Sequence, residues 1–420
     1  MTEKDGYTFE GWYIDNDFIE PFVDDKMPAH DVILHAKWFS HLITITFDAM
    51  GGSPINPVLG STDESIVWPN NPVKEGYVFC GWYMHIDDHF PYDGTVFPNT
   101  SFVLYAKWAT EGLVYNILND GLSYEVGIGE DFSLVEIIIP SMYEGLPVTK
   151  IMDQGFAYVE LMTSITIPHS IMHIGHRAFM YASSLTTIIL PSNLQSIGNA
   201  VFRFCYELET IVIDESNPQF INVEGILFNK DMTRLIRYPQ AKTLTQYSIP
   251  NSVTIIEEDA FSDADNLISL DLGTGVNYIK THAFFRMSSL KHIDIPHQVT
   301  TIELYAFREY SALETITLSS GISEIPSYFC DSCISLKAII IPYSITLIGY
   351  GAFFSCTNLL DIYILRNSLN GMITGSLFMF MYTPTLMRIH FPDQMTVNEY
   401  KVTNYWSSYA SKMVVGSPES

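Results

Sequence analysis

The sequence has few cations. Its 420 residues include 21 Lys and Arg against 47 Asp and Glu, a formal net charge of -26, and no block of basic residues occurs along the chain. Phosphate binding depends on clustered Lys and Arg that release counterions. We therefore expect no nucleic-acid partner and no anionic membrane surface as a partner. The acidic excess is interpreted as a surface kept soluble by net repulsion.

Long apolar runs and a cysteine framework are also missing. No stretch reaches the roughly 18 apolar residues of a membrane-spanning helix, so we expect no membrane insertion by this segment. Residues 1–13 contain no basic region followed by an apolar one, the pattern of a secretory signal. The five cysteines are odd in number and irregularly spaced, which excludes a disulfide framework. The 47% hydrophobic and 14% aromatic content is ample for packed cores.

Two copies of a 70-residue repeat occupy the N-terminal part. Residues 6–13, GYTFEGWY, recur as residues 76–83, GYVFCGWY, and each copy closes with a strand that ends in Ala-Lys-Trp. The second copy opens with an alternating strand over 43–48, which a glycine-containing turn follows. We predict small β modules here.

The first copy has no room for that opening strand. We therefore predict a partial module over 1–40 and a complete module over 41–109, and we expect the polypeptide to be a fragment of a longer protein.

The rest of the chain repeats a different pattern: L-x-x-I-x-I-P, a turn, V-x-x-I, and x-A-F before the next leucine. Seven of the ten intervals between the last apolar residues of successive strands are 23 residues long. These residues are Ile139, Ile167, Leu190, Ile213, Ile249, Leu272, Ile295, Leu318, Ile341, Ile364 and Phe391. A strict period of this length means that each unit buries its apolar face on its neighbours. The predicted fold is mostly β, a solenoid of about eleven coils with period 23.

Within each coil, the L-x-x-I-x-I segment is predicted to be a short strand, and the recurrent phenylalanines are predicted to stack inside the coil. These phenylalanines are Phe179, Phe202, Phe261, Phe284, Phe307 and Phe353. The 36-residue interval holds an insertion that we interpret as a hairpin projecting from the coil. The predicted segments are an N-terminal capping hairpin over 110–131, the solenoid over 132–392 with the insertion near 220–240, and a C-terminal cap and tail over 393–420.

Both repeats resemble known families. The 70-residue modules, with G-Y-x-F-x-G-W-Y and a closing L-x-A-K-W strand, are similar to the Listeria/Bacteroides repeat, also called the internalin B-repeat. That resemblance implies a β-grasp-like fold. The 23-residue repeats, best seen in 165–179 and 339–353, resemble the BspA-type leucine-rich repeat. Together the resemblances cover almost the whole chain and imply an extracellular protein of the bacterial cell surface, with adhesion as its role.

One cysteine pair has the spacing of a redox or zinc motif. Cys330 and Cys333 form a C-x-x-C sequence, but Cys205, Cys333 and Cys356 occupy one column of the repeat and no second C-x-x-C exists. We interpret these cysteines as buried, inert thiols in preference to a functional pair.

Three histidines lie close together in the sequence. His169, His173 and His176 fall on variable positions of the repeat, so we interpret them as chance histidines and not as a metal site. No Ser/His/Asp order and no glycine-rich phosphate loop is found. The sequence therefore predicts no enzyme activity, no catalytic residues and no cofactor or metal.

The informative positions are the two outward residues of each L-x-x-I-x-I strand, because successive strand residues face opposite sides. Strands about 4.8 Å apart would give eleven strands a face about 50 Å long. Asp271 and Asp294 are predicted neighbours, which costs energy unless a cation or a basic partner compensates. Ile340 and Tyr363 are a predicted apolar and aromatic anchor. The candidate ligand-binding residues, on a face expected to be concave, are Ile189, Val212, Asp271, His292, Asp294, Ile340, Asp361 and Tyr363.

Two functions follow from this organisation. The first is an adhesion or protein-interaction module that binds a protein or glycan ligand of a host or neighbouring cell on that face. The alternative is a structural stalk or spacer that binds nothing itself, since solenoid sheets also tolerate mixed residues.

Overall fold

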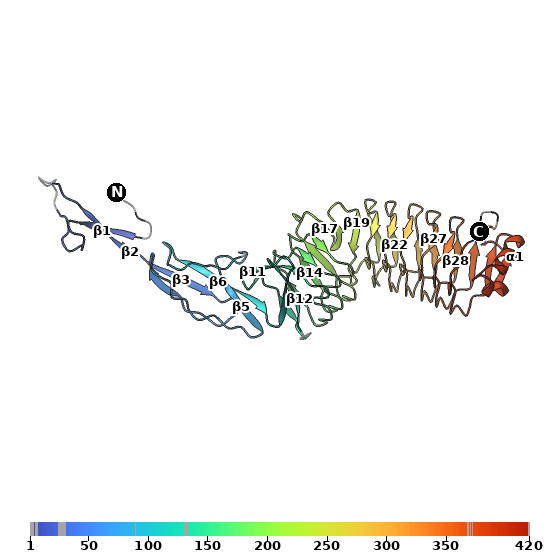
Figure 1. The fold of residues 1–420 in the computed structure, drawn as a ribbon, viewed down its shortest axis with the longest axis horizontal. Coiled ribbons are helices and arrows are strands. Elements are labelled where there is room, and N and C mark those ends of the chain that lie inside the picture. The colour runs from blue at the N-terminus through green and yellow to red at the C-terminus, as the bar shows by residue number, and fades with distance from the viewer. Residues whose placement is uncertain are drawn as a thin grey trace. The chain divides into compact units, whose positions relative to one another are not determined.

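The computed structural model describes residues 4, 7–23, 31–88, 90–129, 133–367, 369, 371 and 373–418. The chain divides into two compact units, 1–111 and 112–420 (Figure 1). The predicted boundary between 131 and 132 lies outside the described residues.

The first unit contains both 70-residue repeats. In the first copy, β1 (Tyr7–Tyr13) pairs antiparallel with β2 (His35–Ser40). In the second, β3 (Leu42–Asp48), β4 (Val58–Ser61), β5 (Tyr77–Tyr83) and β6 (Phe102–Thr110) form one sheet in the order β4-β3-β6-β5, with β3 and β6 parallel.

The two copies share their strand register. Phe9 pairs with Trp38 and Phe79 pairs with Trp108, and in each copy a bulge follows the phenylalanine. The repeated G-Y-x-F-x-G-W-Y sequence therefore builds the same local structure twice.

The second unit is the predicted solenoid, and its L-x-x-I-x-I segments form the front strands. They are β9 (Glu136–Ile138), β12 (Ser164–Thr166), β14 (Thr187–Leu190), β16 (Thr210–Ile213), β20 (Gln246–Ser248), β22 (Ser269–Asp271), β24 (His292–Asp294), β26 (Thr315–Thr317), β28 (Ala338–Ile341), β30 (Asp361–Ile364) and β31 (Arg388–Phe391). Their pairing within the short sheets that they form is parallel. Figure 1 shows them following one another along the solenoid.

The V-x-x-I segments form a second series, the side strands, which the sequence analysis did not assign as strands. They are the end of β11 (Leu146–Ile151), β13 (His173–Ile174), β15 (Ser196–Ile197), β21 (Ile255–Ile256), β23 (Tyr278–Ile279), β25 (Thr301–Ile302), β27 (Glu324–Ile325) and β29 (Leu347–Ile348). Most contain only two residues, too few for an alternation pattern to reveal them.

The predicted phenylalanine ladder is present in the core. Ring centroids are 5.8 Å apart for Phe179 and Phe202, 5.5 Å for Phe261 and Phe284, and 5.0 Å for Phe284 and Phe307. Full burial of such side chains stabilises the coil by roughly 1.5–3 kcal/mol each. The ladder breaks after Phe202 because the insertion follows.

The insertion corrects one prediction. β18 (Ile226–Asn229) and β19 (Arg234–Arg237) form the expected hairpin, but β17 (Phe220–Val223) joins them as a third strand. The hairpin does not project: β19 pairs in parallel with the side strand β21. Ile226, Leu227, Phe228 and Leu235 are buried, so the apolar residues draw the hairpin into the solenoid wall.

Both ends of the solenoid are capped. β7 (Leu113–Ile117) and β8 (Tyr124–Ile128) form the predicted N-terminal hairpin, and β8 pairs with β11, which β10 (Met142–Tyr143) also joins. At the other end lie α1 (Gln394–Val402), the 3-10 helix Ser407–Lys412 and β32 (Met413–Val415), which pairs with β31. Tyr400 and Trp406 are fully buried there.

Candidate binding surfaces

The outer face of the front strands carries the residues that the sequence analysis singled out. Alternation along each strand buries the Leu and Ile positions and turns the intervening side chains outward. Ile189, Asp271, His292, Asp294 and Ile340 are exposed on this face. The remaining candidates, Val212, Asp361 and Tyr363, are partly exposed.

Two apolar pairs lie in register on this face. Ile189 pairs with Val212, and Ile340 pairs with Tyr363. Ile189 is 63% exposed and Ile340 is 42% exposed, which is unusual for isoleucine. The structure does not bring the two pairs together, because β20, β22, β24 and β26 lie between them in the series.

The acidic pair has local partners. Asp294 Oδ1 lies 3.0 Å from His292 Nε2, and the backbone N–H of Gly273 donates to Asp271 Oδ1 at 2.9 Å. Among the residues that the structure describes, no group of three or more His, Cys, Asp or Glu side chains is placed to hold a metal ion.

The last two front strands carry a charged network that the sequence did not predict. Asp361 Oδ1 accepts from Arg388 Nε at 2.9 Å and lies 2.8 Å from His390 Nε2. Burial acts to raise the pKa of Asp361, but the hydrogen bonds from His390 and Arg388 outweigh it and leave that pKa lowered. His390 faces outward as the strand alternation predicts, since it pairs with Tyr363 and its ring stacks on Tyr363 at 4.4 Å. It is nevertheless buried, and β32 lies beside its strand.

The cysteines of the C-x-x-C sequence lie in the core. Cys205, Cys330, Cys333 and Cys356 are all buried and unpaired. Burial raises the pKa of the Cys205 thiol to about 12, and those of Cys330 and Cys356 also rise well above the ordinary value. Thiols held protonated in this way are poor nucleophiles and poor metal ligands.

The three histidines each contact the following coil. His169 and His173 lie 3.0 and 2.8 Å from the hydroxyls of Ser192 and Ser196, and His176 Nδ1 accepts from the N–H of Asn199 at 3.0 Å. They act as links between coils.

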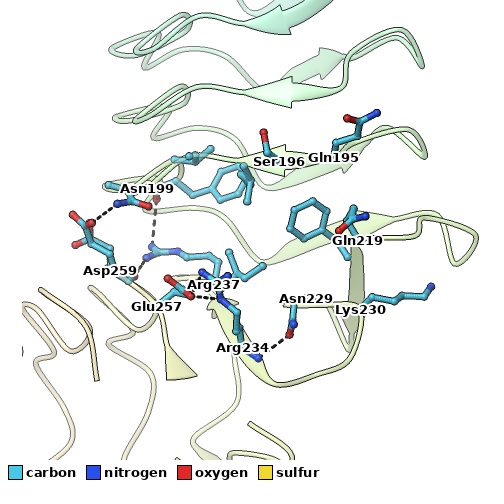
Figure 2. Close-up of a pocket in the computed structure, with 18 of the residues that line it drawn as sticks. Gln195, Ser196, Asn199, Gln219, Asn229, Lys230, Arg234, Arg237, Glu257 and Asp259 are labelled. Atoms are coloured by element: carbon cyan, nitrogen blue, oxygen red, sulfur yellow. Dashed lines mark hydrogen bonds and ion pairs between the residues drawn. The ribbon is translucent and has the colours of Figure 1, made fainter. Parts of the chain in front are cut away.

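A cavity of about 370 Å³ lies where the insertion interrupts the solenoid. One wall is the continuous segment 195–203, and the facing wall comes from 218–220, 229–231, 234, 236–237 and 257–259. Figure 2 shows Gln195 and Ser196 on one side, with Gln219, Asn229 and Lys230 opposite. This cavity falls within the size range of about 300–1,000 Å³ that is usual for ligand sites.

Charged side chains are buried at the base of this junction. Arg237 is 3% exposed and donates to the carbonyl of Phe202 at 3.3 Å, to the Ser262 hydroxyl at 3.0 Å and to the backbone of Asp259. Arg203 Nε lies 3.6 Å from Asp259 Oδ1. The arginines thus link the coils on the two sides of the insertion.

Two carboxyl groups here have raised pKa values. Burial raises the pKa of Asp259 to about 6 and that of Asp263 to about 6, because it outweighs the lowering effect of Arg203, Arg237 and Arg286. Both oxygens of Asp259 lack a hydrogen-bond partner among the described residues.

The sequence analysis missed the junction, although a signal was present. Each regular coil holds two residues with positive φ around its A-F segment, and Asp259 (φ 57°) and Asp263 (φ 57°) occupy them in the coil after the insertion. Two acids that flank a core phenylalanine, next to the irregular 36-residue interval, indicate a coil whose neighbour is not a regular coil.

Comparison with known families gives two matches. The model for the BspA type leucine-rich repeat region matches residues 130–232, 237–360 and 285–405, and the model for the Listeria-Bacteroides repeat domain matches 1–37 and 44–107. The leucine-rich repeat fold and family are typically non-enzymatic. No helix in the described part of the chain is long and apolar enough to span a bilayer.

Individual relatives share parts of the chain. A putative membrane protein of Evansella cellulosilytica is 33% identical over 129 residues, which are 30% of this chain and 19% of that protein. Internalin H of Listeria monocytogenes is 41% identical over 83 residues, 19% of this chain and 15% of that protein. The matches therefore span less than a fifth of either relative.

A solved structure shares the fold. The crystal structure of a leucine-rich repeat protein from Eubacterium ventriosum covers 69% of this chain and 91% of its own, with a TM-score of 0.52 at 20% identity. A likeness at this identity is one of fold.

Proposed function

Because the chain belongs to the BspA type leucine-rich repeat family and carries Listeria-Bacteroides repeat modules, we propose that its solenoid is a protein-binding module of an adhesive protein at a bacterial cell surface. The surface location is supported by relatives described as a putative membrane protein and as Internalin H. In this proposal the N-terminal modules act as spacers.

The observation that carries the proposal is the apolar pair Ile340 and Tyr363 on the outer face of the front strands. The pair is in register on neighbouring strands, and His390 holds the Tyr363 ring by stacking at 4.4 Å. A preorganised aromatic ring beside an exposed isoleucine is the arrangement found at binding hot spots, because little side-chain freedom is lost on contact.

The test is a binding screen of the full chain against immobilised extracellular matrix proteins and glycans, followed by substitutions at the pair. For a protein ligand, Tyr363→Ala and Ile340→Asp are expected to weaken binding about tenfold or more. Tyr343→Ala is the matched control, since Tyr343 is 59% exposed but lies outside the front strands.

Unchanged affinity in both face variants would remove this face as the binding site. Failure of the chain to bind any protein or glycan in the screen would favour the stalk function instead.

A further inference from the structure

Each regular coil forms hydrogen bonds with the next through the backbone of its side strand. The carbonyls of Met172 and Ile174 accept from the N–H groups of Gln195 and Gly198 in the following coil, at 2.8 Å each. Two carbonyls are used in this way in most coils.

The turn around each A-F segment supplies three donors to the next coil. The N–H groups of Arg177, Phe179 and Tyr181 donate to carbonyls of the following coil at 3.0 Å each. The same three bonds recur between the coils that contain Phe307 and Phe329, at 2.7–3.3 Å.

The coil over 195–204 departs from this pattern at all five positions, whereas the coil over 300–309 departs at two, the carbonyls of Thr300 and Ile302. In the described part of the chain, none of the five equivalent backbone groups has a hydrogen-bond partner: the carbonyls of Gln195 and Ile197, and the N–H groups of Ala200, Phe202 and Phe204. The insertion takes the place of the coil that would have bonded to them, so β15 ends one sheet and β17 ends the next.

The cavity lies along this same backbone. Its wall includes every residue from 195 to 203, which carries four of the five groups. Ala200 and Phe202 are 7% and 2% exposed, and a buried N–H without a partner destabilises the fold.

We propose that the cavity is a strand-addition site, in which an extended segment of a partner protein lies parallel to β15 and forms the missing backbone bonds. The two carbonyls and the three alternate N–H groups that follow them are spaced to pair with the backbone of one extended peptide. Neighbouring side strands of the solenoid are parallel, so the added segment is expected to be parallel as well. Added strands bind through main-chain hydrogen bonds and through pockets for alternate side chains. Val201, Phe220 and Ile236 line the cavity and supply apolar contacts for such side chains.

This site is distinct from the outer face of the front strands. None of the eight candidate residues of that face lines the cavity. The strand-addition site and the proposed function therefore rest on different residues, and either can fail without the other.

The test uses the full chain and a capped nine-residue peptide with the sequence of residues 171–179, IMHIGHRAF. This peptide has the sequence of the preceding coil segment, which already pairs with the other side of 195–204 through β13 and β15. Peptide-dependent protection from hydrogen exchange is expected at residues 200, 202 and 204, by at least tenfold, with none from a scrambled peptide of the same composition.

A cavity-filling variant gives the second arm. Gln219 is exposed on the wall opposite β15, so Gln219→Trp is expected to weaken peptide binding at least tenfold, as measured by fluorescence anisotropy. Val223→Trp is the matched control on the adjoining strand, because Val223 is exposed outside the cavity. Absence of protection at 195–204, equal protection by the scrambled peptide, or unchanged binding to Gln219→Trp would each overturn the proposal.

Discussion

At the scale of single residues, Asp259 is held where its charged form is disfavoured. Its folded-state pKa of about 6 lies above the ordinary value of 3.8, so the folded chain binds more protons than the unfolded chain between about pH 4 and pH 6. The stability that this group contributes is therefore present at about pH 4 and is lost as pH rises to about 6. A shift of two units corresponds to about 3 kcal/mol.

Replacing the charge should remove this pH dependence. Asp259→Asn keeps the side-chain shape and suits the positive φ of 57°. We expect the variant to gain stability relative to the wild type as pH is raised from 4 to 7, by up to about 3 kcal/mol. Urea unfolding at both pH values measures the difference.

The control for net charge is Asp231→Asn, which removes an exposed carboxylate from the turn between β18 and β19. A difference between Asp259→Asn and wild type that is the same at pH 4 and pH 7 would contradict the argument.

At the scale of elements, the C-terminal cap should determine the stability of the last coils. Trp406 is fully buried and donates from Nε1 to the carbonyl of Ile373 at 3.0 Å, and its ring lies 5.0 Å from that of Tyr400. Trp406→Ala is expected to cost about 3–5 kcal/mol. Hydrogen exchange should show the loss over β30 and β31. Tyr405→Ala, which removes a partly exposed ring beside it, should leave those strands protected; equal exchange in the two variants would show that the cap is dispensable.

The elements also show what the sequence could and could not predict. The front strands and the phenylalanine ladder were predictable because a 23-residue period fixes each apolar column, as at Phe284 and Phe307. The two-residue side strands were not, because alternation needs more residues to be visible. The hairpin was correctly found as two strands but wrongly placed, since only pairing of β19 with β21 reveals that it continues the wall.

The candidate surfaces divide in the same way. Alternation alone turned Ile340 and Tyr363 outward in register, as the structure has them. It did not predict the burial of His390, because β32 pairs beside that strand from more than 20 residues later in the chain. The junction cavity depends on which coil lacks a neighbour, and no local pattern reports that.

At the scale of the whole molecule, the insertion divides the solenoid core in two. One hydrophobic cluster runs from Val126 to Leu227 and the other from Ile226 to Met413. Across the junction the five backbone bonds of a regular coil are missing. The two sides are joined by side-chain bridges, such as Asn199 to Glu258 at 2.8 Å, and by the backbone bond from the N–H of Ala241 to the carbonyl of Leu208 at 2.9 Å. In a solenoid, stability is a sum of local terms and interfaces between neighbours, so a weak interface uncouples the two sides.

Two matched core substitutions test this division. Phe179 and Phe307 are both 0% exposed, one in each cluster, and replacing either by alanine is expected to cost about 3–5 kcal/mol. With weak coupling, hydrogen exchange should show Phe179→Ala lowering the opening free energy of strands β12 to β16 by that amount, and that of β22 to β28 by less than about 1 kcal/mol. Phe307→Ala should give the reverse pattern. If each substitution destabilised both clusters equally, the two clusters would be coupled across the junction as strongly as two regular coils, and the predicted division would be wrong.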